Sequence, residues 1–465
     1  MIKLELENGR LTDEQVKTLL AAHPSSDDVT KYVENEAYFK GKNPTIINKK
    51  KPDDRTTPDN RVPIPYGRKV ALTTKNYMFN RPVNYVADDK KYQESLYEVL
   101  YLNGHDKKNT AIGQGLIVHG VAYKLFYTDE ISGSVRPLWA VVPPAEIIPV
   151  YDYSIEPKLI AAVRYYRRGT TPETNIEIYY PGLKQLCTLK DGIFSAREDV
   201  PSGYASIPLV VYAGDYRVGV FDAVKPIIDA IDKIVSQDVN EIEKFELAYL
   251  VLTGQKMKPE TVQKIKEKRL FELEKDATLE YLTKTINGEF NGSVLDFLVN
   301  EVHKQTGVPD FASKDFAAES GIALQYKLMG FENIASDIEA VFKEGEYQSI
   351  DLINEIILRN AGKSLTEKMA FWRKQKRASV DIQMSRNLPE DVKQKIDNAK
   401  GLKEIGISQE TVIEAVSSIL PVDEATEMKR KEEEKAAYVD IFKAQPPASK
   451  DGDEEGDEKK DDSAA

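Results

Sequence analysis

The chain has 465 residues, of which 41% are hydrophobic and 30% charged, and this balance predicts a folded, soluble protein rather than a disordered one. Its net charge of −12 argues against tight binding of DNA, which depends on neutralising phosphates, but not against a protein past which DNA slides. Cys187 is the only cysteine, which excludes an intramolecular disulfide and a cysteine-cluster metal site. No run approaches the ~18 apolar residues of a membrane span, and the start MIKLELENGRLTDEQ does not resemble a signal peptide.

Residues 11–41 predict two short helices, separated by a break at Pro24-Ser25-Ser26. Thr12 is placed to cap the first helix, and Gln15 three residues later completes a capping box.

Residues 43–65 are rich in Lys, Asp, Asn and Pro and have no apolar period, so we expect an extended, exposed segment. Its KKKPDDR run is either a solvated loop or a phosphate-binding patch, and the acids that follow the lysines favour the loop. Three helices are predicted next, at residues 66–80, 92–103 and 110–119.

From Gly120 the apolar period changes to two, which predicts strands with a hairpin turn at Ser132-Gly133. Further strands are expected at 159–167, 176–180 and 185–190. Residues 1–220 are therefore predicted to form an α+β unit with an antiparallel sheet.

The first half of the chain carries no recognisable catalytic motif. It has no phosphate-binding P-loop, no dinucleotide fingerprint around Gly113 and Gly115, no GxSxG and no HExxH. The four histidines are scattered, and His119 is interpreted as structural. Asp152 follows a strand end with no second ligand nearby, which argues against a metal site. We therefore expect no catalytic residue, no metal and no cofactor.

Long helices dominate the centre of the chain. Residues 221–250 and 289–306 predict two amphipathic helices, and residues 320–359 predict a third that extends for roughly 60 Å. The third helix contains Gly330 and Gly345, which indicate a bend or close packing. In the first helix, the apolar residues predicted to share one face are Ile227, Ile231, Ile234, Ile242, Phe245 and Tyr249.

The last hundred residues begin with two predicted strands within 368–384, followed by helices at 389–399, 408–418 and 423–442. The basic and aromatic residues of the strand segment, from Phe371 to Arg377, form either an outward strand face or a stacking platform for single-stranded nucleic acid. After residue 445 the composition is acidic and of low complexity, which predicts disorder.

Several of these segments resemble the portal proteins of tailed bacteriophages, of the type found in phages of Gram-positive bacteria. The resemblance covers roughly residues 40–420 and starts at PPAEIIPVYD (143–152). Segment 214–254 adds a helix that carries Pro226, Asp229, Asp232, Ser236 and Asn240 at the spacing of that family. Further matches are GVPDF with SGIAL (307–324) and SRNLPED (385–391), and their order makes the similarity specific.

The resemblance implies a portal fold of the α+β class, with a wing, a stem, a clip and a crown. The expected parts are the N-terminal wing (1–220), a stem helix (221–250), the clip (251–288), a second stem helix (289–308), a tunnel loop (309–320), the rest of the wing with its long kinked helix (321–386), a helical crown (387–442) and an acidic disordered tail (443–465). Within the clip it implies a strand at 248–253, a helix at 259–272 and a strand at 278–284.

The charges of two of these parts give candidate functional residues. The clip carries Lys256, Lys258, Lys264, Lys268 and Arg269, which form either a docking face for an acidic partner or a solvated helix face. In the tunnel loop, the candidate residues are Asp310, Lys314, Asp315 and Glu319. If the loop faces DNA, its acids repel phosphate and its single lysine offers a weak contact, which suits sliding rather than holding.

The resemblance implies a non-enzymatic ring of twelve subunits at one capsid vertex of the virion, made in the host cytoplasm, through which double-stranded DNA is packaged and ejected. Expected partners are the major capsid protein and scaffold, the terminase large subunit and the head-completion adaptor. The residue pattern agrees in one respect, because a helical hairpin with an inserted module needs neighbours to bury its sides. The alternatives are another oligomeric phage head-tail connector or tail structural protein, and an acidic nucleic-acid-processing enzyme.

Overall fold

The structure of the chain is a computed structural model that describes residues 2–53, 57–131, 133–214, 217–246, 249–253, 276–282, 288–311, 321–360, 380–387, 392–417 and 426–434. The chain divides into two compact units, Met1–Asn387 and Leu388–Ala465. The first unit contains sheets and helices together, which confirms the predicted α+β class.

The larger sheet has the strand order β1-β5-β6-β7-β8-β10, with β9 paired to β8. Its neighbours are antiparallel except for β1 and β5, which are parallel. The strands predicted at 159–167, 176–180 and 185–190 correspond to β6, β7 and β8. The bounds are β1 Ile2–Lys3, β5 Ile147–Tyr151, β6 Leu159–Arg167, β7 Thr174–Tyr180, β8 Leu183–Lys190, β9 Ile193–Phe194 and β10 Glu198–Pro201.

Helix α1 (Asp13–Ala22) covers one face of the larger sheet through Val16 and Leu19, which pack with residues of β5, β6 and β7. The predicted capping box at its start is confirmed. Gln15 N donates to the Thr12 hydroxyl at 3.2 Å, and Thr12 N donates to the Gln15 side chain at 2.9 Å. The short 3-10 turn η1 (His23–Ser25) then ends α1 at the position where the sequence predicted a break between two helices.

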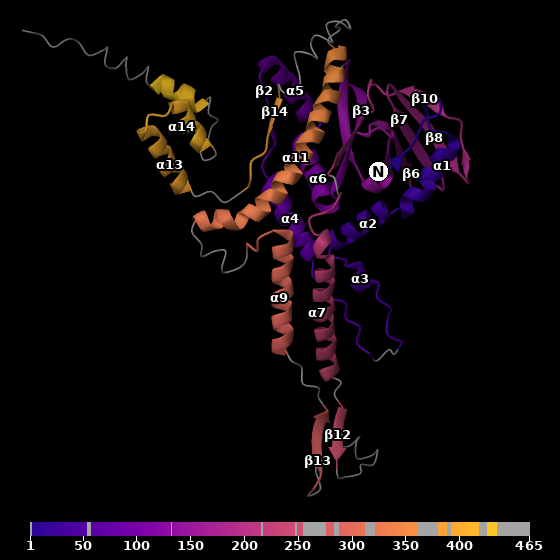
Figure 1. The fold of residues 1–465 in the computed structure, drawn as a ribbon, viewed down its shortest axis with the longest axis vertical. Helices are drawn as coiled ribbons and strands as arrows, with labels where there is room; N and C mark the ends of the chain where they lie inside the picture. The colour runs from indigo at the N-terminus through magenta and orange to yellow at the C-terminus, as the bar shows by residue number, and fades with distance from the viewer. Residues whose placement is uncertain are drawn as a thin grey trace, which may run out of the picture. The chain divides into compact units, whose positions relative to one another are not determined.

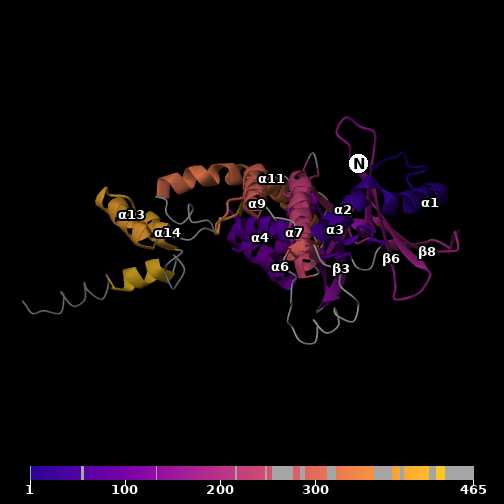
Figure 2. The ribbon, with the colours of Figure 1, turned by 90° about the horizontal axis from the view of Figure 1, so that it is seen from below.

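The smaller sheet has the order β11-β3-β4, with bounds β3 Val121–Ile131, β4 Ser134–Val142 and β11 Leu209–Ala213. Two sheets thus replace the single sheet predicted for residues 1–220. They share a core with α2 (Asp27–Phe39), in which Val29, Tyr123 and Ala162 are all buried. In Figures 1 and 2 the larger sheet and α1 lie to one side of β3. Helices α4 (Tyr66–Phe79), α6 (His105–His119) and α11 (Gly321–Asn360) lie to the other side.

The remaining helices of the first half are α3 Pro44–Ile47, α4 Tyr66–Phe79, α5 Lys90–Leu102 and α6 His105–His119, with the 3-10 turns η2 Pro144–Glu146 and η3 Asp222–Val224. The helix predicted at 110–119 therefore begins five residues earlier, directly after Gly104, whose φ of 57° is left-handed. Strand β2 (Asn84–Ala87) pairs antiparallel with β14 (Val380–Gln383). The predicted strand near 380 is thus confirmed, but within the described residues it joins β2 and neither of the two larger sheets.

Helix α11 (Gly321–Asn360) confirms the predicted long helix, and Figure 1 shows that it is bent. A buried polar network holds it to the smaller sheet. Lys124 Nζ of β3 lies 2.9 Å from Glu346 Oε1, and Tyr212 of β11 donates to the same oxygen at 2.5 Å. Both charged side chains are at most 2% exposed, so each charge is neutralised by the other in a site that water does not solvate.

Helices α7 (Lys225–Glu246) and α9 (Gly288–Thr306) confirm the two predicted amphipathic helices and run side by side away from the sheets (Figure 1). The first helix ends at Glu246, before the predicted residue 250, because Tyr249–Thr253 forms strand β12. β12 pairs antiparallel with β13 (Thr278–Leu282), which confirms the two strands expected in the clip. The helix expected at 259–272 lies outside the described residues.

The second unit is helical where it is described. It contains α13 (Val392–Glu404), α14 (Gln409–Val416) and a helical segment at 426–434. Ala399 and Ile413 are buried between α13 and α14. Ser408 caps α14, because its hydroxyl accepts from Thr411 N at 3.3 Å. The predicted acidic tail (443–465) lies outside the described residues.

Candidate functional site

The candidate site is the helical hairpin formed by α7 and α9, together with the residues that attach it to the sheets. The two helices pack against each other, and Asn291 of α9 donates to Asp238 of α7 at 2.7 Å. On the outer sides, Ile242 of α7 is 61% exposed and Phe297 of α9 is 60% exposed. Ile231, predicted to share one helix face with Ile242, is 1% exposed, so burial on this face changes along α7 in the single subunit.

The chain enters the hairpin past the turn at Gly120 that joins α6 to β3. Gly120 and Gly219 allow this close approach, since a Cβ on Gly120 would lie 2.3 Å from Val218 N and one on Gly219 would lie 2.2 Å from Val118 O. Arg217 takes the left-handed φ of 47°, which non-glycine residues rarely adopt. The path of the chain into α7 is therefore fixed by backbone contacts on both sides.

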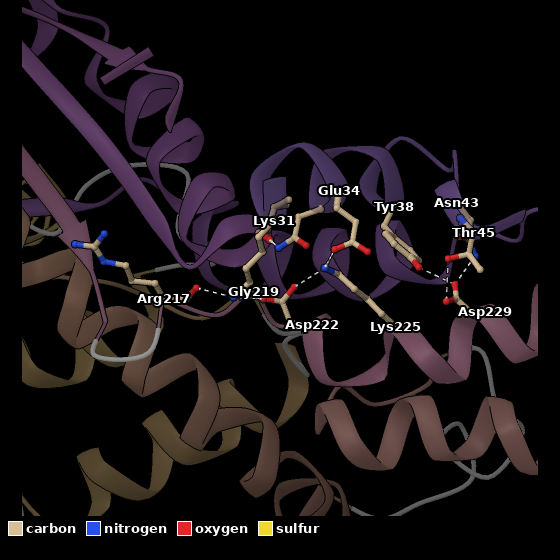
Figure 3. A network of polar contacts seen from close by, with 12 residues as sticks. Lys31, Glu34, Tyr38, Asn43, Thr45, Arg217, Gly219, Asp222, Lys225 and Asp229 are labelled. Carbon is tan, nitrogen blue, oxygen red and sulfur yellow. Dashed lines mark hydrogen bonds and ion pairs between the residues drawn. The ribbon is translucent and has the colours of Figure 1, made fainter. Parts of the chain in front are cut away.

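Helix α2 runs beside the start of α7 and is joined to it by alternating charges (Figure 3). Lys31 lies 2.9 Å from Asp222, and Glu34 lies 2.9 Å from Lys225. Lys225 also lies 3.4 Å from Asp222, so the four groups form one continuous network. Because Asp222 and Lys225 are each at most 13% exposed at their side chains, the network is screened less than surface ion pairs are.

Asp229 continues this attachment one turn further along α7. Its carboxylate accepts from Tyr38 Oη at 2.6 Å, from Asn43 Nδ2 at 2.8 Å and from Thr45 Oγ1 at 3.1 Å (Figure 3). Asn43 Nδ2 also donates to Asp232 at 2.7 Å. The end of α2 and the turn after it are thereby fixed to two carboxylates on one face of α7.

An extended segment, residues 58–65, lies along the next turns of α7; we call it the strap. Three side chains of α7 accept its backbone N–H groups: Asp232 from Ile64 at 2.8 Å, Ser236 from Val62 at 3.0 Å and Asn240 from Asn60 at 2.7 Å.

The spacing of the three hydrogen bonds between α7 and the strap follows from backbone geometry. Four helical residues rise about 6.0 Å and two extended residues about 6.6 Å, so every fourth side chain of α7 meets every second N–H of the strap. The prediction that residues 43–65 form an extended segment is confirmed for the strap, but it is wrong for Pro44–Ile47, which form the short helix α3 capped by Asn43. The expectation that the segment is exposed is wrong for residues 58–64, which are half-buried. Lys49, Lys50 and Lys51 of the KKKPDDR run remain exposed.

Burial raises the pKa of Asp232, whose exposure is 0%. The hydrogen bonds from Ile64 N and Asn43 oppose this shift, and the neighbouring Asp229 carboxylate adds to it. Tyr38, which donates to Asp229, has a pKa raised above its usual value, chiefly by burial. Both groups act as hydrogen-bonding links that join α7 to α2, to Asn43 and to the strap.

The far end of α9 leads into the predicted tunnel loop through Asp310. Lys69 of α4 lies 3.0 Å from the Asp310 carboxylate. His303 holds the turn, because its Nδ1 lies 2.9 Å from the Val308 carbonyl oxygen, which fixes the proton on Nδ1. Asp310 is thus placed at the base of the hairpin. Lys314, Asp315 and Glu319 lie outside the described residues, as do the clip residues Lys256, Lys258, Lys264, Lys268 and Arg269.

The SRNLPED motif ends the first unit with a clasp on α11. Arg386 Nε lies 2.9 Å from Glu332, and Arg386 NH1 lies 2.6 Å from Glu339. Asn387 N donates to Tyr77 O at 2.8 Å, which ties the chain to α4 as well. The clasp therefore anchors the point from which the second unit continues.

The remaining residues considered for chemistry have structural surroundings. Burial lowers the pKa of His119, which lies 3.4 Å from Glu36. Asp152 organises a loop, and hydrogen bonds from Ser154 and from Lys158 N lower its pKa. Across the described ranges, no group of three or more His, Cys, Asp or Glu is placed to hold a metal ion. None of the helices found there has the length and apolar character of a membrane span.

The contacts that the strap and Asn43 make with α7 were missed by the sequence reasoning, because single polar residues in a Pro-rich segment carry no periodic signal. The residues of α7 that bind the strap did carry a periodic signal. Asp232, Ser236 and Asn240 recur every four residues, which places three hydrogen-bonding groups in a row on one helix face. A polar row of this kind beside an apolar face indicates that a second segment lies on it.

Two comparisons with known proteins identify the family of this chain. A family model described as phage portal protein, SPP1 Gp6-like, matches residues 21–439. A portal protein of Clostridium phage phiCD119 is 22% identical over 339 residues, which cover 67% of this chain and 74% of the relative. The matched region includes the hairpin, its attachment to α2, the strap and the Arg386 clasp. The chain belongs to the SPP1 Gp6-like family of phage portal proteins.

Proposed function

We propose that this chain assembles into a closed ring at one vertex of the phage capsid, and that the ring encloses a channel for double-stranded DNA. The observation that carries the proposal is the hairpin of α7 and α9 with exposed apolar residues on both helices. Ile242 and Phe297 are each about three-fifths exposed in the single subunit. Burying such a side chain stabilises an interface by ~1.5–3 kcal/mol, and a ring provides a neighbour on each side of the hairpin.

The elements then take the parts implied by the family. The sheets with α1 to α6 and α11 form the wing, α7 and α9 form the stem, the β12–β13 ribbon belongs to the clip, and the second unit forms the crown. Within the described residues, β12 and β13 pair only with each other, so each keeps an open edge. Open edges accept further strands, which supports lateral pairing between neighbouring subunits.

The segment after Asp310 forms the tunnel loop in this proposal, with Lys314, Asp315 and Glu319 on the channel side. Like charges repel DNA phosphates, so the loop guides the duplex without holding it. Packaging and ejection both require such low friction. The chain acts as a structural component, and ATP hydrolysis belongs to the terminase.

The partners follow from the same assignment. The wing contacts the major capsid protein and the scaffold, and the clip docks the terminase large subunit and later the head-completion adaptor. The basic clip residues Lys256, Lys258, Lys264, Lys268 and Arg269 are the proposed docking face. Twelve subunits are expected, and the assembled ring is part of the virion.

A pair of variants tests the ring. Ile242→Asp with Phe297→Asp places charges on the outer sides of the hairpin, whereas Gln237→Asp with Asn300→Asp places the same charges at exposed polar positions of the same helices. Sedimentation velocity is expected to show rings for the wild type and the polar control, and subunits for the apolar pair. If all three proteins assemble equally well, the exposed apolar residues of the hairpin do not lie in the interface between subunits.

The channel role needs its own test, because a ring can assemble without conducting DNA. Asp315→Ala with Glu319→Ala, introduced into the phage genome, is expected to lower the yield of DNA-filled heads while leaving ring assembly intact. Unchanged packaging in this variant would contradict the assignment of the tunnel loop.

A further inference from the structure

The loop between β5 and β6, residues 152–158, is held rigid by its own side chains. Asp152 Oδ1 accepts from Lys158 N at 2.8 Å and from the Ser154 hydroxyl at 2.6 Å. Asp152 N donates to Lys158 O at 3.0 Å, and Tyr153 Oη donates to Lys3 O at 2.9 Å. The loop is therefore preorganised, and it loses little conformational entropy when it binds.

This rigid loop carries an aliphatic side chain into solvent. Ile155 at its tip is fully exposed at 102%, and the neighbouring Tyr153 is 63% exposed. Single exposed apolar residues are common, but one at the tip of a loop fixed by so many polar bonds resembles a preformed contact. We call residues 152–158 the knob.

A groove suited to such a tip lies between α2 and α6, which pack against each other. It has a volume of about 680 Å³, within the ~300–1,000 Å³ typical of pockets that bury a ligand. Most of its lining is apolar, and Val33 on its rim is 63% exposed. The lining residues used below are Val33, Lys40, Lys42, His119, Pro143 and Pro144.

The polar groups of the groove complement those of the knob. Lys42 on the rim is exposed, and Lys40 lies 3.0 Å from Glu36 at the surface. Both lysines can meet the exposed Glu156, which follows Ile155 in the knob. His119 lines the groove, and its buried Nδ1 has no hydrogen-bond partner within the described part of the chain.

The knob and the groove lie at opposite ends of β5 and cannot meet within one subunit. Pro143 and Pro144, which precede β5, line the groove, and the knob begins directly after Tyr151. A five-residue strand separates them by roughly 17 Å. Two different complementary surfaces on one subunit are what a head-to-tail contact requires, and such contacts close into rings.

We propose that the knob of one subunit docks into the α2–α6 groove of the next copy of this chain, with Ile155 in the groove and Glu156 beside Lys40 and Lys42. This contact rests on the proposed ring and adds a second interface, formed by the sheets rather than by the hairpin. It also gives the ring a direction, since each subunit contributes its knob to one neighbour and its groove to the other.

Cysteine pairs test the contact, because the native Cys187 is buried and gives little background. Assembled protein carrying both Ile155→Cys and Val33→Cys is treated with a short bismaleimide and run on a denaturing gel. A ladder of covalent multimers is expected from this double variant. Each single variant, and the control pair Ile193→Cys with Val33→Cys, should remain monomeric, although Ile193 is 73% exposed at another hairpin.

A charge at the tip tests the same contact without chemistry. Ile155→Asp is expected to raise the protein concentration needed for half-assembly by at least about tenfold, because a buried aliphatic contact is lost. Ile193→Asp should change this concentration by less than about twofold.

Three results would overturn the proposal. Wild-type rings without cross-linking in the double variant would show that the knob and the groove do not meet. Dimers from Ile155→Cys alone would show that two knobs meet each other. Normal rings of Ile155→Asp that fail only to enter capsids would assign the knob to another protein. Absence of any ring in the wild type would instead contradict the proposed function itself, and the contact with it.

Discussion

Two glycines of the long helix α11 are predicted to respond in opposite ways to the same substitution. Gly330 and Gly345 both lie in the helix interior, where alanine is favoured over glycine by ~1 kcal/mol. Among the residues that the structure describes, an added Cβ at Gly330 meets no atom within 4 Å, so Gly330→Ala should stabilise the fold by about that amount. An added Cβ at Gly345 lies 2.2 Å from the ring of Tyr212, far inside an ordinary carbon contact of ~3.5–4.0 Å.

The cost at Gly345 follows from how firmly Tyr212 is held. Its side chain is 0% exposed, and its hydroxyl lies 2.5 Å from Glu346 and 3.0 Å from Ser349. Overpacking a core costs ~1–3 kcal/mol, and a lost hydrogen bond to a charged group adds ~1.5–3 kcal/mol. After the gain in helix propensity, Gly345→Ala should lower the free energy of unfolding by about 1.5–5 kcal/mol.

Urea denaturation of both variants and the wild type, followed by circular dichroism at one protein concentration, measures the two shifts. The midpoints should fall in the order Gly330→Ala, wild type, Gly345→Ala, with similar slopes. A Gly345→Ala variant as stable as Gly330→Ala would refute the tight packing of α11 on the smaller sheet.

Three further predictions concern the polar anchors. Lys124→Met leaves the Glu346 carboxylate buried without its cation and should lower the free energy of unfolding by ~3–5 kcal/mol. Adding Glu346→Leu should restore most of this loss. A Lys124→Met variant that is as stable as the wild type in thermal unfolding would contradict the buried ion pair. Burial raises the pKa of Asp232 above its ordinary 3.8, so the folded state keeps a proton that the unfolded state has lost. The free energy of unfolding of the wild type, relative to that of Asp232→Asn, should therefore fall as pH rises from about 4 through the raised pKa. A relative stability that increases with pH in a denaturation series would contradict this prediction. Arg386→Ala removes the clasp on α11 and should speed proteolytic cutting near residue 388, whereas equal cutting rates would mean that the clasp does not hold this junction.

Much of the fold could be predicted because local signals agree with tertiary packing. The Thr12 capping box, the β3–β4 hairpin and the length of α11 all follow from side-chain chemistry within a few residues or from a long apolar period. The helical hairpin was predicted for the same reason. Its amphipathic stripes are strong, and its connection to the β12–β13 ribbon follows from chain order.

The features that could not be predicted depend on segments that are distant in sequence. The strap pairs residues near 60 with residues near 236, and nothing local in the strap indicates its partner. The pairing of β14 with β2 brings together residues almost 300 positions apart in the chain, so alternation at Val380 and Ile382 predicts a strand but not its neighbour. Ile242 fits an apolar stripe by spacing, yet it is exposed in the single subunit, because spacing cannot distinguish a core from an interface.

The family motif of α7 illustrates how sequence and structure complement each other. Asp229, Asp232, Ser236 and Asn240 were noticed only as a pattern shared with portal proteins. In the structure each of them accepts a hydrogen bond from α2, from the turn after it or from the strap. The pattern therefore describes how the hairpin is attached to α2, to the turn after it and to the strap.

Native mass spectrometry of the purified chain, combined with negative-stain imaging of the same sample, tests the proposed closed ring most directly. A closed ring predicts a single assembly, with a mass that is a whole multiple of 52.4 kDa, and particles with a central hole. A protein that stays monomeric at every concentration, or that forms open filaments without a hole, would contradict the proposal that the hairpins line a closed channel.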